Sequence, residues 1–493
     1  MKKNKGITLI ALAITIILLL ILAGVTVAEL ASDNGIIKKA FEAKDKQEEG
    51  DQKEQDALEE LKSETKDDPT VIGTPYEEIL ETGGTDITMT ASCGVIEIVW
   101  VDKDNNVIEN PMAPQLMGME KVAWNGVTPI EKDQINTNEV WYNYSQNRWA
   151  NAINNGSYFV WIPRYAYKII YFDTDANKNA YLTDNTRTTG IIGYYTKNGK
   201  INKAQNKIII KAEEEIQSPK TKGYTDYIVH PAFLGVGTEN IGGGFGTDSR
   251  GITGMWVAKY EMSGETNGIA SYPKNVATTD TIKAVSKPGV RAWRDINIAN
   301  SYENSFNYDR TKESHLIKNS EWGAVSYLVH SKYGRNATEI EINGGGGNYY
   351  TGYGNGTTTS YAYNTINGML ASSTGNISGI YDLRGNCYEY VAGFNKAYSG
   401  EYFTGTSYLN AKGTHFASTG GNSTKYVTIY ENNSSSHSAT KISDFKNGKK
   451  VSITGDGILE VWKNGTTGWF SDYATFVSSI DPFFVRGRIL YPW

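Results

Sequence analysis

The chain has 493 residues, of which 48 are Lys or Arg and 54 are Asp or Glu, so its formal net charge is −6. Without a basic surplus the composition offers no electrostatic footprint for nucleic acid, and we expect no nucleic-acid partner. The two cysteines, Cys93 and Cys387, are too few for a disulfide framework or a zinc-binding pattern. The sequence leaves open whether they form a disulfide or remain separate thiols.

The N-terminal segment predicts a membrane-spanning helix. An uncharged run from Ile7 to Ala28 is long enough to cross a hydrocarbon core, which requires about 20 residues. Lys2, Lys3 and Lys5 precede this run, so the positive-inside rule predicts a cytoplasmic N-terminus and an extracytoplasmic location for the rest of the chain. A secretory signal peptide would have a shorter apolar stretch of about 7–15 residues. A simple membrane anchor remains an alternative interpretation.

The start of this run, KGITLI from Lys5 to Ile10, resembles the leader of type IV prepilins. The resemblance implies that residues 1–6 are a leader and that a prepilin peptidase cleaves after Gly6. Ile7 would then be the mature N-terminus of a pilin-like helix over residues 7–30. Pilins usually carry Glu as the fifth mature residue, whereas this chain has Ala11. The difference favours a minor pseudopilin or a membrane-held pilin-like protein, with other pilin subunits as partners, over a major filament subunit.

Two segments of different composition follow the membrane helix. Residues 31–69 are rich in Lys, Glu, Asp and Gln and predict a charged helical stalk that is polar on most of its surface. This stalk ends at Asp68, because the residue before Pro69 disfavours a helical backbone. Residues 70–139 predict a small β-rich segment, with its clearest strand from Val95 to Val101.

Two acidic segments begin like calcium-binding loops, Asp102–Asn106 and Asp173–Asn177. Such a loop needs Gly at its sixth position and Glu at its twelfth. The first segment has Val107 and Ala113 there, and the second has Lys178 at its sixth position. We therefore predict turns in both places. A structural calcium ion is unsupported, and no cofactor is predicted.

Aromatic residues and glycines dominate the middle of the chain. Three aromatic strings predict short buried strands, Val140–Tyr144, Tyr158–Tyr165 and Gly254–Glu261. The Gly-rich stretches Gly242–Gly254 and Asn343–Gly356 predict surface loops.

Two segments predict helices. Pro288–Ala299 has Pro near its start, and Glu321–Val329 has Asn319 or Ser320 as its N-cap. Short strands, few helices and long loops together predict an α+β domain.

The string YDLRGNCYEYV, from Tyr381 to Val391, resembles the YDMxGNVWEWV motif of the formylglycine-generating-enzyme superfamily. Trp256–Met262, Leu316–Ala324 and Phe484–Gly487 resemble three other segments of that superfamily, in the same order. The resemblance implies a C-type-lectin-like domain over residues 140–493, truncated or divergent at its C-terminus. The motif residues, with implied structural roles, are Trp256, Tyr260, Glu261, Glu321, Trp322, Asp382, Gly385, Asn386, Glu389, Arg486 and Gly487.

We predict that the domain is not an enzyme. The resemblance implies that catalytic members use a copper-bound cysteine pair near the end of the domain, whereas this chain has only Cys387 there. We interpret Cys387 as a small buried core residue. The five histidines show no H-x-x-x-H spacing, and no G-x-S-x-G sequence is present. An enzyme of the formylglycine-generating type remains the alternative.

Binding is the function that this reasoning favours. Non-catalytic members of the fold use their lectin-like face to bind ligands, and Tyr, Ser, Asn and Gly make adaptable recognition surfaces. We expect exposed loops over residues 344–363 and 395–469, with Trp462, Trp469 and Tyr473 as candidate ligand contacts. The predicted protein is anchored in the membrane and presents a recognition domain to a surface glycan or protein. A purely structural minor pilin is a further alternative.

Overall fold

The computed structural model describes residues 94–184, 189–196, 210–211, 216–271, 273–344, 349–356, 358–395, 422–430, 454–457 and 483–487. Apart from Asp184, these residues belong to one compact unit of the chain. The predicted leader with Gly6 and Ile7, the membrane helix and the stalk lie outside them, as do Cys93, Trp462, Trp469 and Tyr473. No helix among the described residues is long and apolar enough to cross a membrane.

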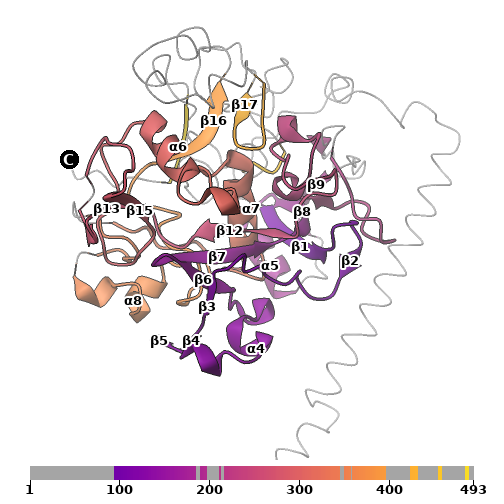
Figure 1. Cartoon of the computed structure of the whole chain (residues 1–493). Helices are drawn as coiled ribbons and strands as arrows, with labels where there is room; N and C mark the ends of the chain where they lie inside the picture. The colour runs from indigo at the N-terminus through magenta and orange to yellow at the C-terminus, as the bar shows by residue number, and fades with distance from the viewer. Residues whose placement is uncertain are drawn as a thin grey trace, which may run out of the picture. The chain divides into compact units, whose positions relative to one another are not determined.

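The described residues form a mixed α+β domain, as the sequence predicts (Figure 1). A six-stranded sheet contains β10 (Ile210–Lys211), β9 (Ile191–Thr196), β8 (Tyr165–Phe172), β1 (Gly94–Val101) and β2 (Val107–Ile108), with β11 (Ile228–Val229) paired to β8. A four-stranded sheet has the order β12 (Gly254–Ala258), β7 (Ser157–Pro163), β6 (Asn151–Asn154), β3 (Glu120–Val122).

Smaller sheets and short helices complete the described part. The strand orders are β14 (Ile269–Ala270), β13 (Ser263–Thr266), β15 (Ile282–Val285), then β17 (Thr428–Tyr430), β16 (Glu389–Asn395), β18 (Phe483–Arg486), and the pair β4 (Trp124–Asn125), β5 (Thr128–Pro129). The α-helices are α4 (Asn138–Trp141), α5 (Asp175–Thr183), α6 (Ile298–Phe306), α7 (Asn319–His330) and α8 (Ile366–Met369).

The predicted strand Val95–Val101 is confirmed as β1. It pairs antiparallel with β8 along its length and with β2 at its C-terminal end. The predicted turn after it is also confirmed, because the Asp102 carboxylate accepts hydrogen bonds from the backbone N–H groups of Asp104 (2.9 Å) and Asn106 (2.8 Å). The second acidic segment differs from the prediction. Instead of a turn, it runs into helix α5, whose first residue is Asp175.

Two of the three predicted aromatic strands are confirmed. Tyr158–Tyr165 corresponds to β7 and the start of β8, and Gly254–Glu261 corresponds to β12 and its continuation. The prediction for Val140–Tyr144 is wrong, because this segment contains the end of α4 and the start of a 3-10 turn. The Thr137 hydroxyl accepts a hydrogen bond from the Val140 N–H at 3.3 Å and caps α4. A local cap therefore decides the structure in place of the aromatic pattern.

Helix α7 is confirmed and occupies the centre of the core. In Figure 1 it lies between β1, β7 and β12 below and β16 and β17 above. Every residue of α7 is buried, which is typical of a helix packed on all sides. Its N-cap is Lys318, ahead of the predicted Asn319 or Ser320, and the Glu321 carboxylate accepts a hydrogen bond from the Lys318 N–H at 2.7 Å.

The prediction of a helix over Pro288–Ala299 is wrong. Residues 288–297 form turns and extended backbone, and α6 begins only at Ile298. The N–H groups of this segment bond to neighbouring segments, Ala292 to the Tyr349 carbonyl (2.9 Å) and Trp293 to the Met262 carbonyl (2.8 Å). The Asn297 side chain then caps α6 by accepting a hydrogen bond from the Asn300 N–H at 2.9 Å. Partners far away in the sequence thus replace the helical hydrogen bonds.

The Gly-rich segments are loops, but they do not lie wholly on the surface as predicted. Gly242 and Gly243 are buried, and their carbonyls accept hydrogen bonds from Ser320 Oγ (2.7 Å) and Lys318 Nζ (2.9 Å). In the second segment Thr351 is fully buried. Glycines let the backbone approach its neighbours closely, so these loops pack against α7 and the strands around it.

Candidate functional site

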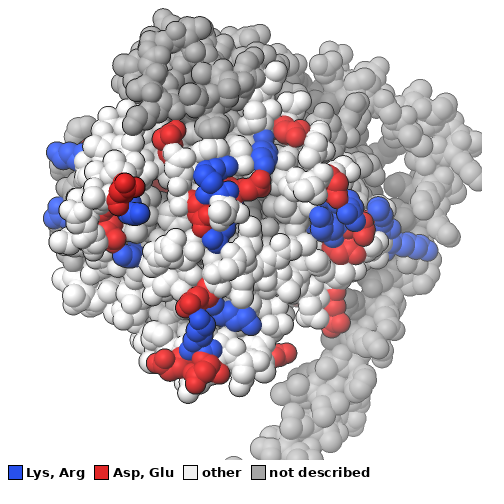
Figure 2. Space-filling model, viewed as in Figure 1, with Lys and Arg blue, Asp and Glu red and all other residues white. Residues whose placement is uncertain are grey.

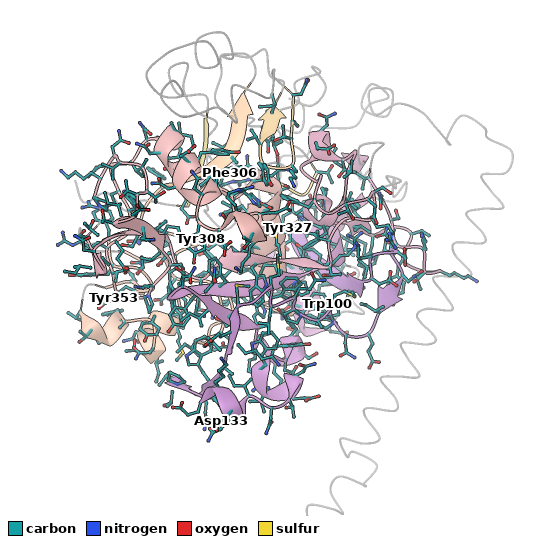
Figure 3. The ribbon with its side chains drawn as sticks, in the orientation of Figure 1. Trp100, Asp133, Phe306, Tyr308, Tyr327 and Tyr353 are labelled. Carbon is teal, nitrogen blue, oxygen red and sulfur yellow. The ribbon has the colours of Figure 1, made fainter. Side chains whose placement is uncertain are left out.

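A cleft of about 830 Å³ opens on one side of the described domain. Strand β12 and the residues after it form one wall, and residues 301–317 and 380–390 form others. The lining combines aromatic side chains with polar and charged ones, and Tyr308, labelled in Figure 3, is one of the aromatic residues. A concave aromatic surface with a few polar groups is the usual form of a ligand-binding site.

Strand β12 supplies the first group of lining residues. Trp256 is paired with Trp161 of β7, and their rings lie 5.2 Å apart. The Trp256 indole N–H donates a hydrogen bond to the Gln115 carbonyl at 2.7 Å. Tyr260 follows the strand, is buried, and stacks on Tyr381 with ring centroids 5.3 Å apart. The aromatic wall therefore has a fixed shape before any ligand arrives.

A buried lysine ties this wall to the segment that precedes the YDLRGN motif. The ammonium group of Lys259 donates hydrogen bonds to the carbonyls of Ile377 (2.5 Å) and Gly379 (2.7 Å). Burial lowers the pKa of Lys259 well below its ordinary value. The side chain is fully enclosed, so we assign it a structural role.

The motif folds into a tight loop that aims Asp382 inward. Asp382, Gly385 and Asn386 all have positive φ angles, of 62°, 104° and 60°. Such a backbone suits Gly, Asp and Asn better than other residues. The Asp382 carboxylate accepts hydrogen bonds from the Gly352 N–H (2.8 Å) and from the Asn343 amide (2.7 Å). The motif thus connects the cleft to the Gly-rich loop beside it.

Three carboxyl groups gather at the cleft wall, where Glu261 and Glu389 line the cleft and Asp382 lies behind them. The Glu261 carboxylate accepts hydrogen bonds from the Asn386 amide (2.6 Å) and the Cys387 N–H (2.9 Å). Burial, followed by the charges of Glu389 and Asp382, raises the pKa of Glu261 well above its ordinary value. Burial and the Asp382 charge raise the pKa of Glu389 to about 8. At neutral pH Glu261 and Glu389 therefore retain protons, whereas Asp382, whose pKa burial raises only to about 6, is mostly ionised.

A histidine and a glutamate form a second polar group in the cleft. His315 Nε2 lies 2.9 Å from a carboxylate oxygen of Glu321, and His315 Nδ1 lies 2.7 Å from the Glu313 carbonyl. Burial acts to lower the pKa of His315, but the Glu321 carboxylate outweighs it, so the pKa is raised. Both ring nitrogens are already engaged, so the imidazole is poorly placed to act as a general base.

Cys387 differs from its predicted core position, because it is half-buried and lines the cleft. Burial and the neighbouring Glu261 raise the pKa of its thiol. A protonated thiol is a weak nucleophile and a poor metal ligand. Within the described ranges, no group of three or more His, Cys, Asp and Glu side chains is arranged to hold a metal ion.

The motif residues named from the sequence come together at this cleft. Those that line it are Trp256, Tyr260, Glu261, Glu321, Trp322 and Glu389. Asp382, Gly385 and Asn386 support it from behind through the contacts given above. Arg486 of β18 is buried, with its guanidinium 4.3 Å above the Trp322 ring and its Nε donating to Asn319 at 2.9 Å, and Gly487 follows it.

Sequence reasoning missed several lining residues, among them Trp293, Tyr308 and His315. Trp293 was assigned to a helix that does not form, and the other two lie in an irregular segment between α6 and α7. An aromatic or histidine residue in a loop carries no local signal that it faces a cleft.

Comparison with known proteins finds no matching family model and no similar curated protein.

Proposed function

We propose that this chain is a pilin-like, membrane-held surface protein that carries a non-catalytic recognition domain of the C-type-lectin-like fold. The observation that carries the proposal is the convergence of the motif residues. Segments near residues 256–261, 321–322 and 389 are far apart in the sequence, yet their side chains line one cleft. The N-terminal resemblance to prepilins supports the location, and the cleft supports the binding function.

The chemistry of the cleft favours binding over catalysis. The thiol of Cys387 has a raised pKa, and the His315 ring is held by two hydrogen bonds. The aromatic wall offers a large preformed contact surface, which lowers the entropic cost of binding. We therefore propose that a cell-surface glycan or protein binds in the cleft without being chemically changed.

The test uses the full-length protein in detergent on an array of glycans and cell-surface proteins. We expect one class of component to bind, and we expect Trp293→Ala and Tyr308→Ala to weaken that binding by about tenfold or more, since aromatic residues dominate binding sites. Tyr224→Ala is the control, because Tyr224 is a half-buried aromatic residue that lies outside the cleft lining. An array without any bound component would contradict the proposal, as would oxidation of a cysteine peptide by the copper-loaded protein.

A further inference from the structure

An uncharged, tyrosine-rich stretch lies beside the cleft. No Asp, Glu, Lys, Arg or His occurs from Ile342 to Tyr381, although 21% of the whole chain is charged. Five half-buried tyrosines lie in its described parts, and four of them define a tyrosine platform, namely Tyr349, Tyr350, Tyr353 and Tyr361. Tyr353 is labelled in Figure 3, and in Figure 2 the surface in the area of α8, at lower left, is almost entirely white.

The rings of the tyrosine platform are held in place by their neighbours. Tyr350 and Tyr353 have ring centroids 5.4 Å apart, and the Arg294 guanidinium lies 4.1 Å from the Tyr349 ring centroid. Tyr361 packs so closely on Gly356 that an added Cβ there would lie 2.3 Å from its ring. The hydroxyl groups, in contrast, make no hydrogen bond to any residue that the structure describes. Each ring therefore presents an apolar face and an unused polar group.

Hydrogen bonds fix the backbone of the tyrosine platform at several points. Gly352 donates to the buried Asp382 carboxylate at 2.8 Å, and Thr351 donates to the Val290 carbonyl at 2.8 Å. Gly354 donates to the Tyr361 carbonyl at 2.8 Å, which closes the loop on itself. A rigid backbone with two-torsion side chains loses little entropy when a ligand binds.

The chemistry of this surface selects an uncharged ligand. Tyrosine combines a broad apolar face with a hydroxyl donor and acceptor, which matches the apolar faces and hydroxyl rim of a sugar ring. A cationic polymer would lose hydration here without gaining an opposite charge, because residues 342–381 supply none. The cations beside the platform are Arg294, which is engaged with Tyr349, and Arg291, whose backbone pairs with Tyr350, and the anionic probes below test whether they attract an anionic polymer.

We infer that the tyrosine platform binds an uncharged polysaccharide, as a binding surface separate from the cleft. The inference rests on the proposed function only for its cell-surface setting. The tyrosine platform and the cleft adjoin at two points. Gly352, between the platform tyrosines, packs on the ring of the cleft residue Tyr260. Arg294, which contacts Tyr349, directly follows the cleft residue Trp293 in the chain. One polymer chain that follows this surface would therefore pass from the platform to the cleft rim.

The test measures calorimetric binding of the full-length protein in detergent to neutral and anionic sugars. The neutral probes are chitohexaose, cellohexaose and maltohexaose, and the anionic probes are hyaluronan and polygalacturonate. We expect at least one neutral probe to bind, with an affinity that changes less than about twofold with salt, since no ionic contact is made. The double variant Tyr350→Ala/Tyr353→Ala should weaken this binding by about tenfold or more.

Two variants separate the platform from general effects of tyrosine removal. Tyr353→Phe keeps the ring and loses the hydroxyl, so its binding should fall between that of the wild type and that of the double variant. Tyr224→Ala removes a half-buried tyrosine outside the platform and should bind like the wild type. Thermal unfolding of each variant verifies that the fold is retained.

Three outcomes would overturn the inference: no binding of any neutral probe, binding of anionic probes only, or unchanged binding by the double variant. The proposed function fails separately. If the array component still depends on Trp293 and Tyr308 while neutral sugars do not bind, the cleft proposal stands and the platform inference falls.

Discussion

At the scale of single residues, Glu261 and Glu389 at the cleft wall keep protons at neutral pH where counter-ions would otherwise be needed. Glu261, Asp382 and Glu389 influence one another, and none of them forms an ion pair with a cationic side chain of the described residues. Burial raises the pKa of Asp382 to about 6 and, together with Asp382, that of Glu389 to about 8. Such groups reduce folding stability wherever the unfolded chain is ionised and the folded chain is not.

The pH dependence of stability tests this arrangement through Glu389→Gln. The pKa of Glu389 rises from 4.5 to about 8 on folding, so the folded protein binds more protons across that window. Stability attributable to this group therefore falls as pH rises from about 4.5 to 8. We expect Glu389→Gln to be more stable than the wild type by about 2 kcal/mol at pH 8, and the difference to vanish near pH 4.

Denaturant unfolding at several pH values measures this difference. Glu120→Gln is the control, because the Glu120 side chain is 60% exposed and its ion pair with Lys132 lies at the surface. Such surface pairs contribute little to stability. A Glu389→Gln variant whose stability follows the wild type at every pH would show that the pKa of Glu389 is not raised on folding.

At the scale of elements, close backbone approach determines where the motif loop lies. Gly385 has a φ angle of 104°, and an added Cβ would lie 2.6 Å from the Asn343 carbonyl oxygen. Asn343 in turn donates to Asp382, so the loop, the Gly-rich segment and the cleft wall share one network. The sequence indicated the YDLRGN loop through a resemblance, whereas its contact with Asn343 appears only in the folded chain.

Gly385→Ala should therefore destabilise the domain by more than about 2 kcal/mol, because both the left-handed backbone and the close contact oppose a side chain. Gly289→Ala is the matched control. Gly289 has a φ angle of 68° but no atom within 4 Å of an added Cβ, so only the backbone cost of about 1 kcal/mol should appear. Equal unfolding free energies for the two variants would show that the contact at Gly385 adds nothing.

At the scale of the whole molecule, the N-terminal segment and the described domain contribute different parts of the proposed function. The run from Ile7 to Ala28 predicts attachment to a membrane, and the domain supplies the cleft and the tyrosine platform. An attached recognition domain acts at a high effective concentration near its surface ligands. Processing of the N-terminus decides between a pilin-like protein and a simple anchor.

We expect the protein made in cells with a prepilin peptidase to begin at Ile7. N-terminal sequencing and intact mass measure this directly. Gly6→Val should block cleavage, whereas Gly24→Ala, which changes a glycine inside the apolar run, should leave it unchanged. Retention of Met1 in the wild-type protein would exclude the pilin route and leave a membrane anchor.

The sequence by itself determined the features that depend on neighbours along the chain. The β-branched run of β1, the acidic turn after it and the apolar length of α7 follow from local patterns, and the resemblance predicts the motif residues. The same local reasoning failed at Pro288–Ala299 and Val140–Tyr144, where hydrogen bonds to distant segments or a nearby cap outweigh periodicity.

Only the tertiary structure decided what those residues form together. It placed Trp293, Tyr308 and His315 in one cleft, half-exposed Cys387 on its wall, and buried part of the predicted surface loops. The physical reason is that burial and pKa depend on atoms supplied by remote segments, which no local pattern specifies. The sequence specifies the chemistry of each side chain, whereas the fold decides which other groups surround it.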